Sequence, residues 1–446
     1  MLSAILLALS LPFEGSPFGF HPASVPPDIG GGDPFGPAKE IGVRWHRPPV
    51  YAFWFLVQKT WEDYVEGRFR WEGLDRIVAS VPRGINILWN LSARFYTRPG
   101  SFLPRDIEGF KRYVKEVVER YDGDGFKDAP GSPIVKYWQI ENEPNLAWLW
   151  RKQGTPEEYA QLLLAAYEAA KEANPGCKVL IGGVGGGPGE GPDSSLYGFR
   201  HFYVPVLEAL RGRGFDIFDY HWYGNARGDY KRFERVYREV RRALDKYGFE
   251  DAEIWVTEMS TYSGKPRGHP YQSEEEQAAD LVKRYIFSLW LGVKKVFWAF
   301  GLAEGFKHDD GYFDHTGLIY DGLGSDDRGR GVRKLAFYAY KVMTQKLEGS
   351  DWDNVRRLQT GEGSVLAFEF KNPRAPKRRV IVVWWDWFEE PEVNVKRLTL
   401  DIGAEEALLT KALTDEAGNV KSWRRKAPGG RLSLELDISP LFVEPL

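Results

Sequence analysis

The chain has 446 residues, of which 43% are hydrophobic, and its 60 Lys and Arg against 63 Asp and Glu leave a formal net charge of −3. This near balance shows no bias toward a polyanion, so nucleic acid is not an expected partner, and no apolar run reaches the roughly 18 residues of a membrane span. The length accommodates a barrel of roughly 250 to 350 residues and a small second domain.

Apolar strands alternate with amphipathic helices through most of the chain. The strands are predicted over residues 18–21, 43–47, 85–91, 134–140, 178–182, 215–220, 253–257 and 293–300. The helices are predicted near residue 38 and over residues 71–81, 104–121, 155–174, 199–210, 232–247, 273–291 and 333–347. Strands that alternate with helices pair in parallel, so eight such units predict an α/β fold, a closed (β/α)8 barrel over residues 12–347.

The pattern changes after residue 347 to short strands with alternating polar and apolar residues. These are predicted over residues 363–370, 379–385, 398–402 and 432–438. We therefore expect a C-terminal all-β sandwich over residues 348–446. Bracing of the barrel is its favoured role, with polysaccharide binding or a subunit interface, and hence a homo-oligomer, as alternatives.

The start of the chain and its composition leave localisation open. Residues 1–11 are apolar and are interpreted either as a signal-peptide remnant, although a basic n-region is missing, or as a segment packed on the body of the protein or its β domain. Export is favoured over the cytoplasm. Cys177 is the only cysteine, which excludes an intrachain disulfide and a thiolate metal cluster. Few Met, many charged residues and 28 Pro would suit a thermophile.

Two predicted strands run directly into glutamates. Residues 134–140 lead into Glu141-Asn142-Glu143-Pro144-Asn145, and residues 253–257 lead into Glu258. The C-terminal ends of barrel strands meet on the face that carries the chemistry, so Glu143 and Glu258 are predicted to share one site. Two carboxyl groups roughly 5 to 5.5 Å apart are what a retaining glycosidase requires. The alternative is a pair of solvated loop acids.

These motifs resemble the clan A glycoside hydrolases, retaining (β/α)8 enzymes whose acid/base follows an Asn on strand four and whose nucleophile ends strand seven. The resemblance implies that Glu143 is the general acid/base, that Asn142 donates to the sugar 2-hydroxyl, and that Glu258 is the nucleophile. Arg47 matches the arginine that keeps the clan's nucleophile ionised, with Arg44 as the alternative and a structural ion pair as the plainer interpretation.

Further supporting residues follow from the same resemblance. His221-Trp222-Tyr223 is similar to the clan's His-x-Tyr, which implies a hydrogen bond from Tyr223 to the nucleophile, and Trp298 has the place of the aromatic floor of the −1 subsite. Ordinary packing is the alternative for each. Glu141 is expected on the same strand face as Glu143, in a buried supporting role. Because flat rings grip sugar faces, five tryptophans are candidates for lining sugar subsites: Trp54, Trp61, Trp148, Trp150 and Trp222.

The resemblance covers nearly the whole chain and implies a retaining hydrolase of β-linked sugars, acting on an oligosaccharide or polysaccharide without a cofactor or metal. Pro144-Asn145 favours families 39 and 5, with family 39 first, although residues 139–143 are also similar to clan A β-galactosidases. A non-catalytic carbohydrate-binding barrel and a transglycosylating enzyme of the clan stay open. A metal-dependent isomerase is disfavoured, since no His/Asp/Glu set with ligand spacing is visible at the strand ends.

Two loops carry weaker signals. Residues 182–191 are glycine-rich but lack the Lys-Ser/Thr of a phosphate-binding loop. The loop after the eighth strand contains residues able to bind a cation, although a solvated or substrate-lining loop is the favoured interpretation. These residues are His308, Asp309, Asp310, Asp314 and His315.

Overall fold

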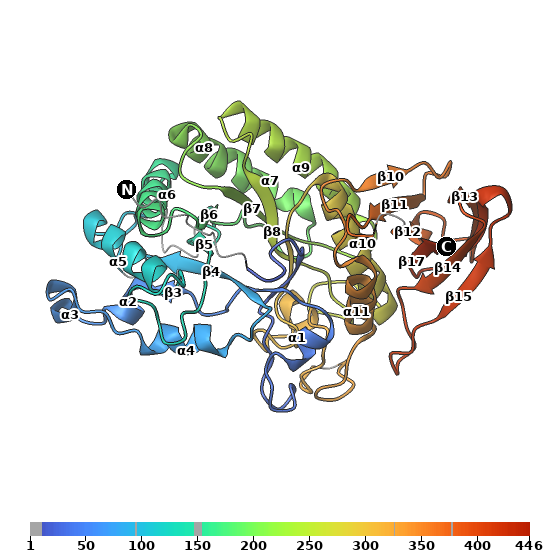
Figure 1. Ribbon diagram of the computed structural model, residues 1–446, viewed down its shortest axis with the longest axis horizontal. Coiled ribbons are helices and arrows are strands. Elements are labelled where there is room, and N and C mark those ends of the chain that lie inside the picture. Colours follow the sequence, from blue (N-terminus) through green and yellow to red (C-terminus); the bar gives the residue numbers. More distant parts are fainter. Residues whose placement is uncertain (1–10, 94–95, 147–153, 325, 376–377) are drawn as a thin grey trace.

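The computed structural model describes residues 11–93, 96–146, 154–324, 326–375 and 378–446. Eight parallel strands form a barrel ringed by helices (Figure 1). They are β1 (Phe18–His21), β2 (Trp45–His46), β4 (Asn86–Ser92), β5 (Tyr137–Ile140), β6 (Lys178–Ile181), β7 (Ile217–Tyr223), β8 (Glu253–Ser260) and β9 (Val296–Ala299). Pairing of β2 with β4 closes the ring, which confirms the predicted barrel.

Two of the long helices begin at the predicted residues, 155 and 273. Thr155 and Ser273 each form a capping box at the start of a long helix. The main helices are α1 (Gly36–Glu40), α4 (Glu72–Ser80), α5 (Ile107–Arg120), α6 (Pro156–Ala173), α8 (Val204–Leu210), α9 (Asp229–Lys246), α10 (Glu274–Leu291) and α11 (Leu335–Leu347). Shorter elements lie in the connecting segments: β3 (Ala52–Phe53), α2 (Trp54–Val57), α3 (Trp61–Val65) and α7 (Leu196–Gly198).

Side chains that point into the barrel form layers. An apolar layer fills its N-terminal end and takes one residue from each of seven strands: Trp45, Leu88, Tyr137, Leu180, Ile217, Trp255 and Phe297. Two residues further along five of these strands the inward side chains turn polar, because side chains alternate with period two. This buried polar layer is Arg47, Asn90, Gln139, Asp219 and Thr257. The barrel interior is thus filled by apolar side chains at its N-terminal end and lined by polar side chains toward its C-terminal end.

The C-terminal region is a two-sheet sandwich. A six-stranded antiparallel sheet contains, in spatial order, β10 (Arg356–Leu358), β11 (Val365–Lys371), β12 (Arg379–Trp385), β17 (Leu441–Pro445), β14 (Glu406–Lys411) and β15 (Ser422–Lys426). The second sheet pairs β13 (Lys396–Asp401) with β16 (Arg431–Leu436). In Figure 1 the sandwich, in orange and red, lies beside α10 and α11. One face of the larger sheet joins the main core of the barrel, with Phe368 packed 5.4 Å from the ring of Trp290.

A buried polar cluster also ties the sandwich to the barrel. The carboxylate of Asp386, which is fully buried, accepts hydrogen bonds from Lys283 Nζ at 3.0 Å and from the Tyr230 hydroxyl at 2.7 Å. Lys231 Nζ lies 2.5 Å from the same carboxylate. Removal of one partner of a buried pair leaves the others as uncompensated charges, which is costly.

Asp386→Asn is therefore expected to lower the free energy of unfolding by about 3–5 kcal/mol. Chemical denaturation followed by fluorescence measures the loss. Glu389→Gln is the matched control, since Glu389 pairs with the same Lys231 at 2.6 Å but is 42% exposed. The free energy of unfolding of Glu389→Gln is expected to fall by no more than about 1 kcal/mol. Equal losses in the two variants would contradict a bracing role for the buried cluster.

The start of the described chain lies against the barrel. Leu11 packs in the apolar layer with Trp45 and Leu88, at the N-terminal end of the barrel rather than on the sandwich. Residues 1–10 lie outside the described residues. No helix among the described residues has both the length and the apolar character needed to cross a membrane.

Candidate active site

Arg47 is the centre of a polar network at the C-terminal end of the barrel. The guanidinium is fully buried and donates from Nε to Asn90 Oδ1 at 3.1 Å and to Gln139 Oε1 at 3.0 Å. Its two terminal nitrogens donate to Asn142 Oδ1 at 2.6 Å and to Glu258 Oε1. The structure thus brings the predicted Arg47 onto Glu258, whereas Arg44, the alternative, packs on the ring of Phe13.

Glu258 lies in β8, 1% exposed, with donors on both oxygens. Tyr223 donates its hydroxyl to Oε2, and His221 Nδ1 lies 3.6 Å from that oxygen. Burial by itself raises the pKa of Glu258, but the positive charges of His221 and Arg47 outweigh burial and bring the pKa to about 2. His21 Nε2, 3.7 Å away, adds no charge at neutral pH because burial and Arg47 lower the pKa of His21 to about 3. Glu258 is therefore ionised.

Glu143 has the opposite electrostatic setting. It follows β5 and has a positive φ of 42°. Its Oε1 accepts a hydrogen bond from His221 Nδ1 at 3.0 Å. Burial raises the pKa of Glu143 and outweighs the hydrogen bond from His221, and the charge of Glu258 raises it further. One oxygen of each glutamate and one nitrogen of His221 lie within 4.8 Å of one another. The site thus holds two adjacent carboxyl groups whose pKa values are driven in opposite directions.

His221 bridges the two glutamates and is oriented by Asp219, a residue that the sequence predictions missed. Its Nε2 lies 2.9 Å from Asp219 Oδ2 and 3.0 Å from Thr257 Oγ1. Burial lowers the pKa of His221, but the charges of Glu258 and Asp219 dominate and raise it to about 10. The imidazole is therefore a cation at neutral pH. The sequence signal that could have identified Asp219 was a polar residue at an inward-facing position of an otherwise apolar strand.

The structure corrects the predicted aromatic floor. Trp298 lies in the core between strands and helices, while its neighbour Phe297 faces the barrel interior. Because side chains alternate along a strand, Trp298 points away from the site. Phe300 instead lies at the site, with its ring 5.3 Å from that of His21 and 6.2 Å from that of Tyr223.

The other predicted tryptophans have different outcomes. Trp54 and Trp222 are buried in the core between strands and helices, so the prediction that they line sugar subsites is wrong. Trp61 is 76% exposed on α3, and its sugar-binding role stays a prediction. Trp148 and Trp150 lie outside the described residues.

Glu141 is buried beneath the site and holds the end of the neighbouring strand. Its carboxylate accepts the Ala93 backbone N–H at 2.8 Å and the Ser92 hydroxyl at 2.6 Å. The expected common strand face with Glu143 is not found, because β5 ends at Ile140 and both glutamates have positive φ. The contacts of Glu141 are those of a supporting residue.

The glycine-rich loop after β6 makes room for the site. A Cβ on Gly183 would lie 2.1 Å from His221 Nε2, and one on Gly185 would lie 2.7 Å from the carboxyl carbon of Glu143. Asn145 holds this loop, donating to Gly185 O at 2.8 Å and accepting from Gly185 N at 2.9 Å. Gly183 therefore lets the backbone pass directly beside His221, and Gly185 lets it pass beside Glu143.

The acidic loop after β9 satisfies its own polar groups. Asp314 accepts the backbone N–H groups of Lys307, His308 and Asp309, and His315 Nε2 lies 2.9 Å from Asp310 Oδ1. The five residues considered for a cation site therefore stabilise the loop rather than converge on one point.

The sequence analysis expected no set of possible metal ligands at the strand ends, and this expectation is wrong. Glu143, His221 and Glu258 do converge at the strand ends as a possible ligand set. A cation there would meet the guanidinium of Arg47 and the charged imidazole of His221, which already compensate the carboxylates. The electrostatics of the site therefore favour proton transfer over metal binding.

Comparisons with known proteins establish the fold. No protein-family model matches the chain, and no curated protein matches it. A glucosidase structure from Croceicoccus marinus is similar with a TM-score of 0.64 and 18% identity, covering 96% of this chain and 97% of that one. A family 39 glycoside hydrolase from Bacteroides cellulosilyticus has a TM-score of 0.63 and 18% identity, covering 92% and 77%. An α-L-arabinofuranosidase from Thermotoga maritima has a TM-score of 0.60 and 13% identity, covering 97% and 93%. The chain therefore has the fold of the clan A glycoside hydrolases, a closed (β/α)8 barrel with a β-sandwich.

Proposed function

We propose that this protein is a retaining glycoside hydrolase that cleaves β-linked sugars by double displacement. The observation that carries the proposal is the pair Glu143 and Glu258, which bring one oxygen each within 4.8 Å and whose pKa values are shifted in opposite directions. Retaining glycosidases have carboxyl groups about 5–5.5 Å apart, whereas inverting enzymes need about 6.5–9.5 Å. The similarity of the fold to solved glycosidases supports the same reaction class.

In the first step Glu258 attacks the anomeric carbon and forms a glycosyl ester, while Glu143 gives its proton to the departing oxygen. In the second step Glu143 takes a proton from water, the hydroxide attacks the anomeric carbon, and Glu258 leaves as a carboxylate. Asn142 accepts from Arg47 through Oδ1, so its Nδ2 is the atom that can donate to a sugar hydroxyl.

The change of role of Glu143 follows from electrostatics. The charge of Glu258 raises the pKa of Glu143 in the free enzyme. Ester formation removes that charge, so the pKa of Glu143 falls and the group can act as a base. Tyr223 and Arg47 favour the charged form of Glu258 and therefore its departure in the second step.

The pH dependence of kcat/KM is expected to follow the two glutamates. Glu143 must be protonated, so activity falls as pH rises through its raised pKa. Glu258 must be ionised, so its acid limb lies near its pKa of about 2, well below the ordinary carboxyl range. A pH–rate profile tests both limbs. An alkaline limb that persists unchanged in Glu143→Gln, measured with an activated aryl glycoside, would contradict the assignment.

Gly185→Ala is expected to lower kcat by about 100-fold, because an added methyl group displaces the Glu143 carboxyl from its working position. Steady-state kinetics measures the effect, with circular dichroism as the check on folding. Gly73→Ala is the control, since nothing lies within 4 Å of a Cβ there and Gly73 is in α4. Full activity of Gly185→Ala would show that this loop does not set the position of the Glu143 carboxyl group.

A substrate panel tests the function itself. It contains aryl β-xyloside, β-glucoside, β-galactoside, β-mannoside and β-fucoside, an aryl α-L-arabinofuranoside, and soluble β-glucan, xylan and mannan. We expect hydrolysis of at least one β-linked substrate, with the anomeric configuration of the first product retained by NMR. Activity should be insensitive to a chelator, which separates it from metal-dependent chemistry. An inverted product would contradict the mechanism, and carbohydrate binding without turnover would favour the non-catalytic barrel.

A further inference from the structure

Phe306 is an exposed aromatic residue in the loop that follows β9. It is 45% exposed, and its ring stacks on the ring of Phe300 with a centroid distance of 4.3 Å and an interplanar angle of 16°. The ring of Phe300 lies 5.3 Å from that of His21, whose Nε2 lies 3.7 Å from Glu258 Oε1. A row of rings therefore leads from the candidate nucleophile to the protein surface.

Aromatic neighbours hold Phe300, the ring beneath Phe306, in place. The ring of Phe313 meets Phe300 edge-on at 4.7 Å and 84°, and the ring of Tyr223 lies 6.2 Å away at 21°. Phe300 and Phe313 both pack against a buried cluster that contains Tyr223 and Tyr312. The Tyr312 hydroxyl donates to two backbone carbonyl groups, at 2.9 and 2.8 Å. Phe306 therefore rests on a tightly packed base.

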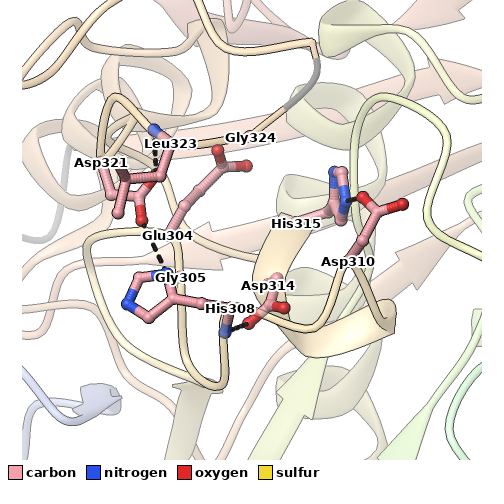
Figure 2. A pocket seen from close by; sticks show the side chains of 9 residues that line it. All are labelled: Glu304, Gly305, His308, Asp310, Asp314, His315, Asp321, Leu323 and Gly324. Carbon is pink, nitrogen blue, oxygen red and sulfur yellow. Dashed lines mark hydrogen bonds and ion pairs between the residues drawn. The ribbon is translucent and has the colours of Figure 1, made fainter.

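The loop that carries Phe306 is fixed on both sides of this residue. On one side the carboxylate of Glu304 pairs with a buried lysine. On the other side Asp314 accepts the backbone N–H groups of Lys307 at 2.6 Å and His308 at 3.0 Å. Figure 2 draws the bond from His308 to Asp314, and both residues line a small pocket together with Glu304. Because the loop is already ordered by its own contacts, it pays little conformational entropy when a ligand binds.

The strand order decides which part of a substrate Phe306 can contact. Glu143 follows β5 and Phe300 follows β9, and these strands lie opposite each other in the barrel, with β6, β7 and β8 between them on one side and β4, β2 and β1 on the other. In the proposed reaction Glu143 protonates the oxygen of the leaving group, so the leaving group lies toward β5. The sugar attacked by Glu258 continues away from the leaving group, on its non-reducing side. Phe306 lies on that side.

We propose that Phe306 binds a second sugar ring on the non-reducing side of the cleaved bond, so that the substrate is a β-linked oligosaccharide or polysaccharide with at least two sugar units on that side. This inference rests on the proposed glycosidase function. A flat apolar ring suits the C–H face of a pyranose. Lys307 Nζ, 5.6 Å from the centroid of the Phe306 ring, can donate to a hydroxyl of the same sugar. Covering the exposed ring supplies binding energy that a substrate with a single sugar cannot use.

Aryl glycosides with one and with two sugar rings test this subsite in the full-length protein. The p-nitrophenyl β-glucoside, β-xyloside and β-mannoside are compared with the p-nitrophenyl β-cellobioside, β-xylobioside and β-mannobioside. We expect kcat/KM to be at least about tenfold higher for one disaccharide substrate than for its monosaccharide counterpart, with the disaccharide released intact. Phe306→Ala should abolish this preference by lowering kcat/KM on the disaccharide substrate. Phe306→Trp, which keeps a flat ring, should retain the preference.

Phe126→Ala is the matched control. Phe126 is 61% exposed and also has a lysine ammonium group 5.6 Å from the centroid of its ring. It lies between α5 and β5, in a segment that leads into the N-terminal end of a strand and hence on the face of the barrel opposite the site. This variant should keep the preference of the parent for the disaccharide substrate.

Binding measured apart from turnover separates the subsite from the proposed reaction. Cellotriose, xylotriose and mannotriose are titrated into the parent and into Phe306→Ala by isothermal calorimetry, and one of them should bind the parent at least about tenfold more tightly. Such binding without any hydrolysis would count against the proposed reaction and still support the subsite. The inference is overturned if cleavage occurs without a preference for two rings, if Phe306→Ala keeps that preference, or if the trisaccharides are neither bound nor cleaved.

Discussion

Glu258→Ala is expected to abolish hydrolysis, lowering kcat/KM by at least about 10⁴-fold. The substitution removes the group placed to form the glycosyl ester, and a water molecule bound in its place cannot form a covalent intermediate. It also leaves the buried guanidinium of Arg47 without its ionised partner, so Glu258→Gln, which keeps the shape, is measured beside it.

Added azide provides a sharper readout than loss of activity alone. A small anion can occupy the space of the missing carboxylate and attack from the same face of the sugar, so a β-glycoside should give an α-glycosyl azide. Glu253→Gln is the matched control, because Glu253 begins the same strand at the opposite end of the barrel and is exposed. Residual activity above about 1% in Glu258→Ala would rule out Glu258 as the nucleophile.

Glu143→Ala is expected to lower kcat by about 10²–10⁴-fold, in a way that depends on the leaving group. An aryl group that departs without a proton spares the first step, so the glycosyl enzyme should accumulate and appear as a burst of released phenol. Substrates with a sugar leaving group need the proton and should lose nearly all turnover. His221, held 3.0 Å from Glu143, would lose one of its partners.

Rescue by azide distinguishes this variant from the first. Azide attacks the glycosyl enzyme of Glu143→Ala from the opposite face, so the product keeps the β configuration. Asn145→Ala serves as the comparison, because it loosens the loop of Gly185 without removing the carboxyl group and should cost less. An equal loss for aryl and natural substrates, with no burst, would contradict an acid/base role for Glu143.

The strand-end glutamates were visible in the sequence because they depend on local pattern. Apolar strands that alternate with helices identify a parallel barrel, and a barrel brings its strand C-termini together. The pairing of Glu143 with Glu258 was therefore predictable from the strand pattern. The helix starts at residues 155 and 273 were predictable as well, because their capping boxes involve residues only three apart.

Side-chain direction at the strand ends was not visible in the sequence. Trp298 was expected at the site, but a shift of one residue along a strand reverses the face, and the ring packs against the helices while Phe300 contacts His21. The role of Asp219 likewise depends on a neighbour far along the chain, because its oxygens meet the side chain of Gln139 from another strand.

The order of strands and helices, the change to a sandwich after residue 347, and the pair Glu143 and Glu258 could all be predicted from the amino-acid sequence, since they depend on periodicity and on short motifs. The contacts that lower the pKa of Glu258 depend on the folded barrel, because Arg47 and His221 approach this carboxylate from other strands.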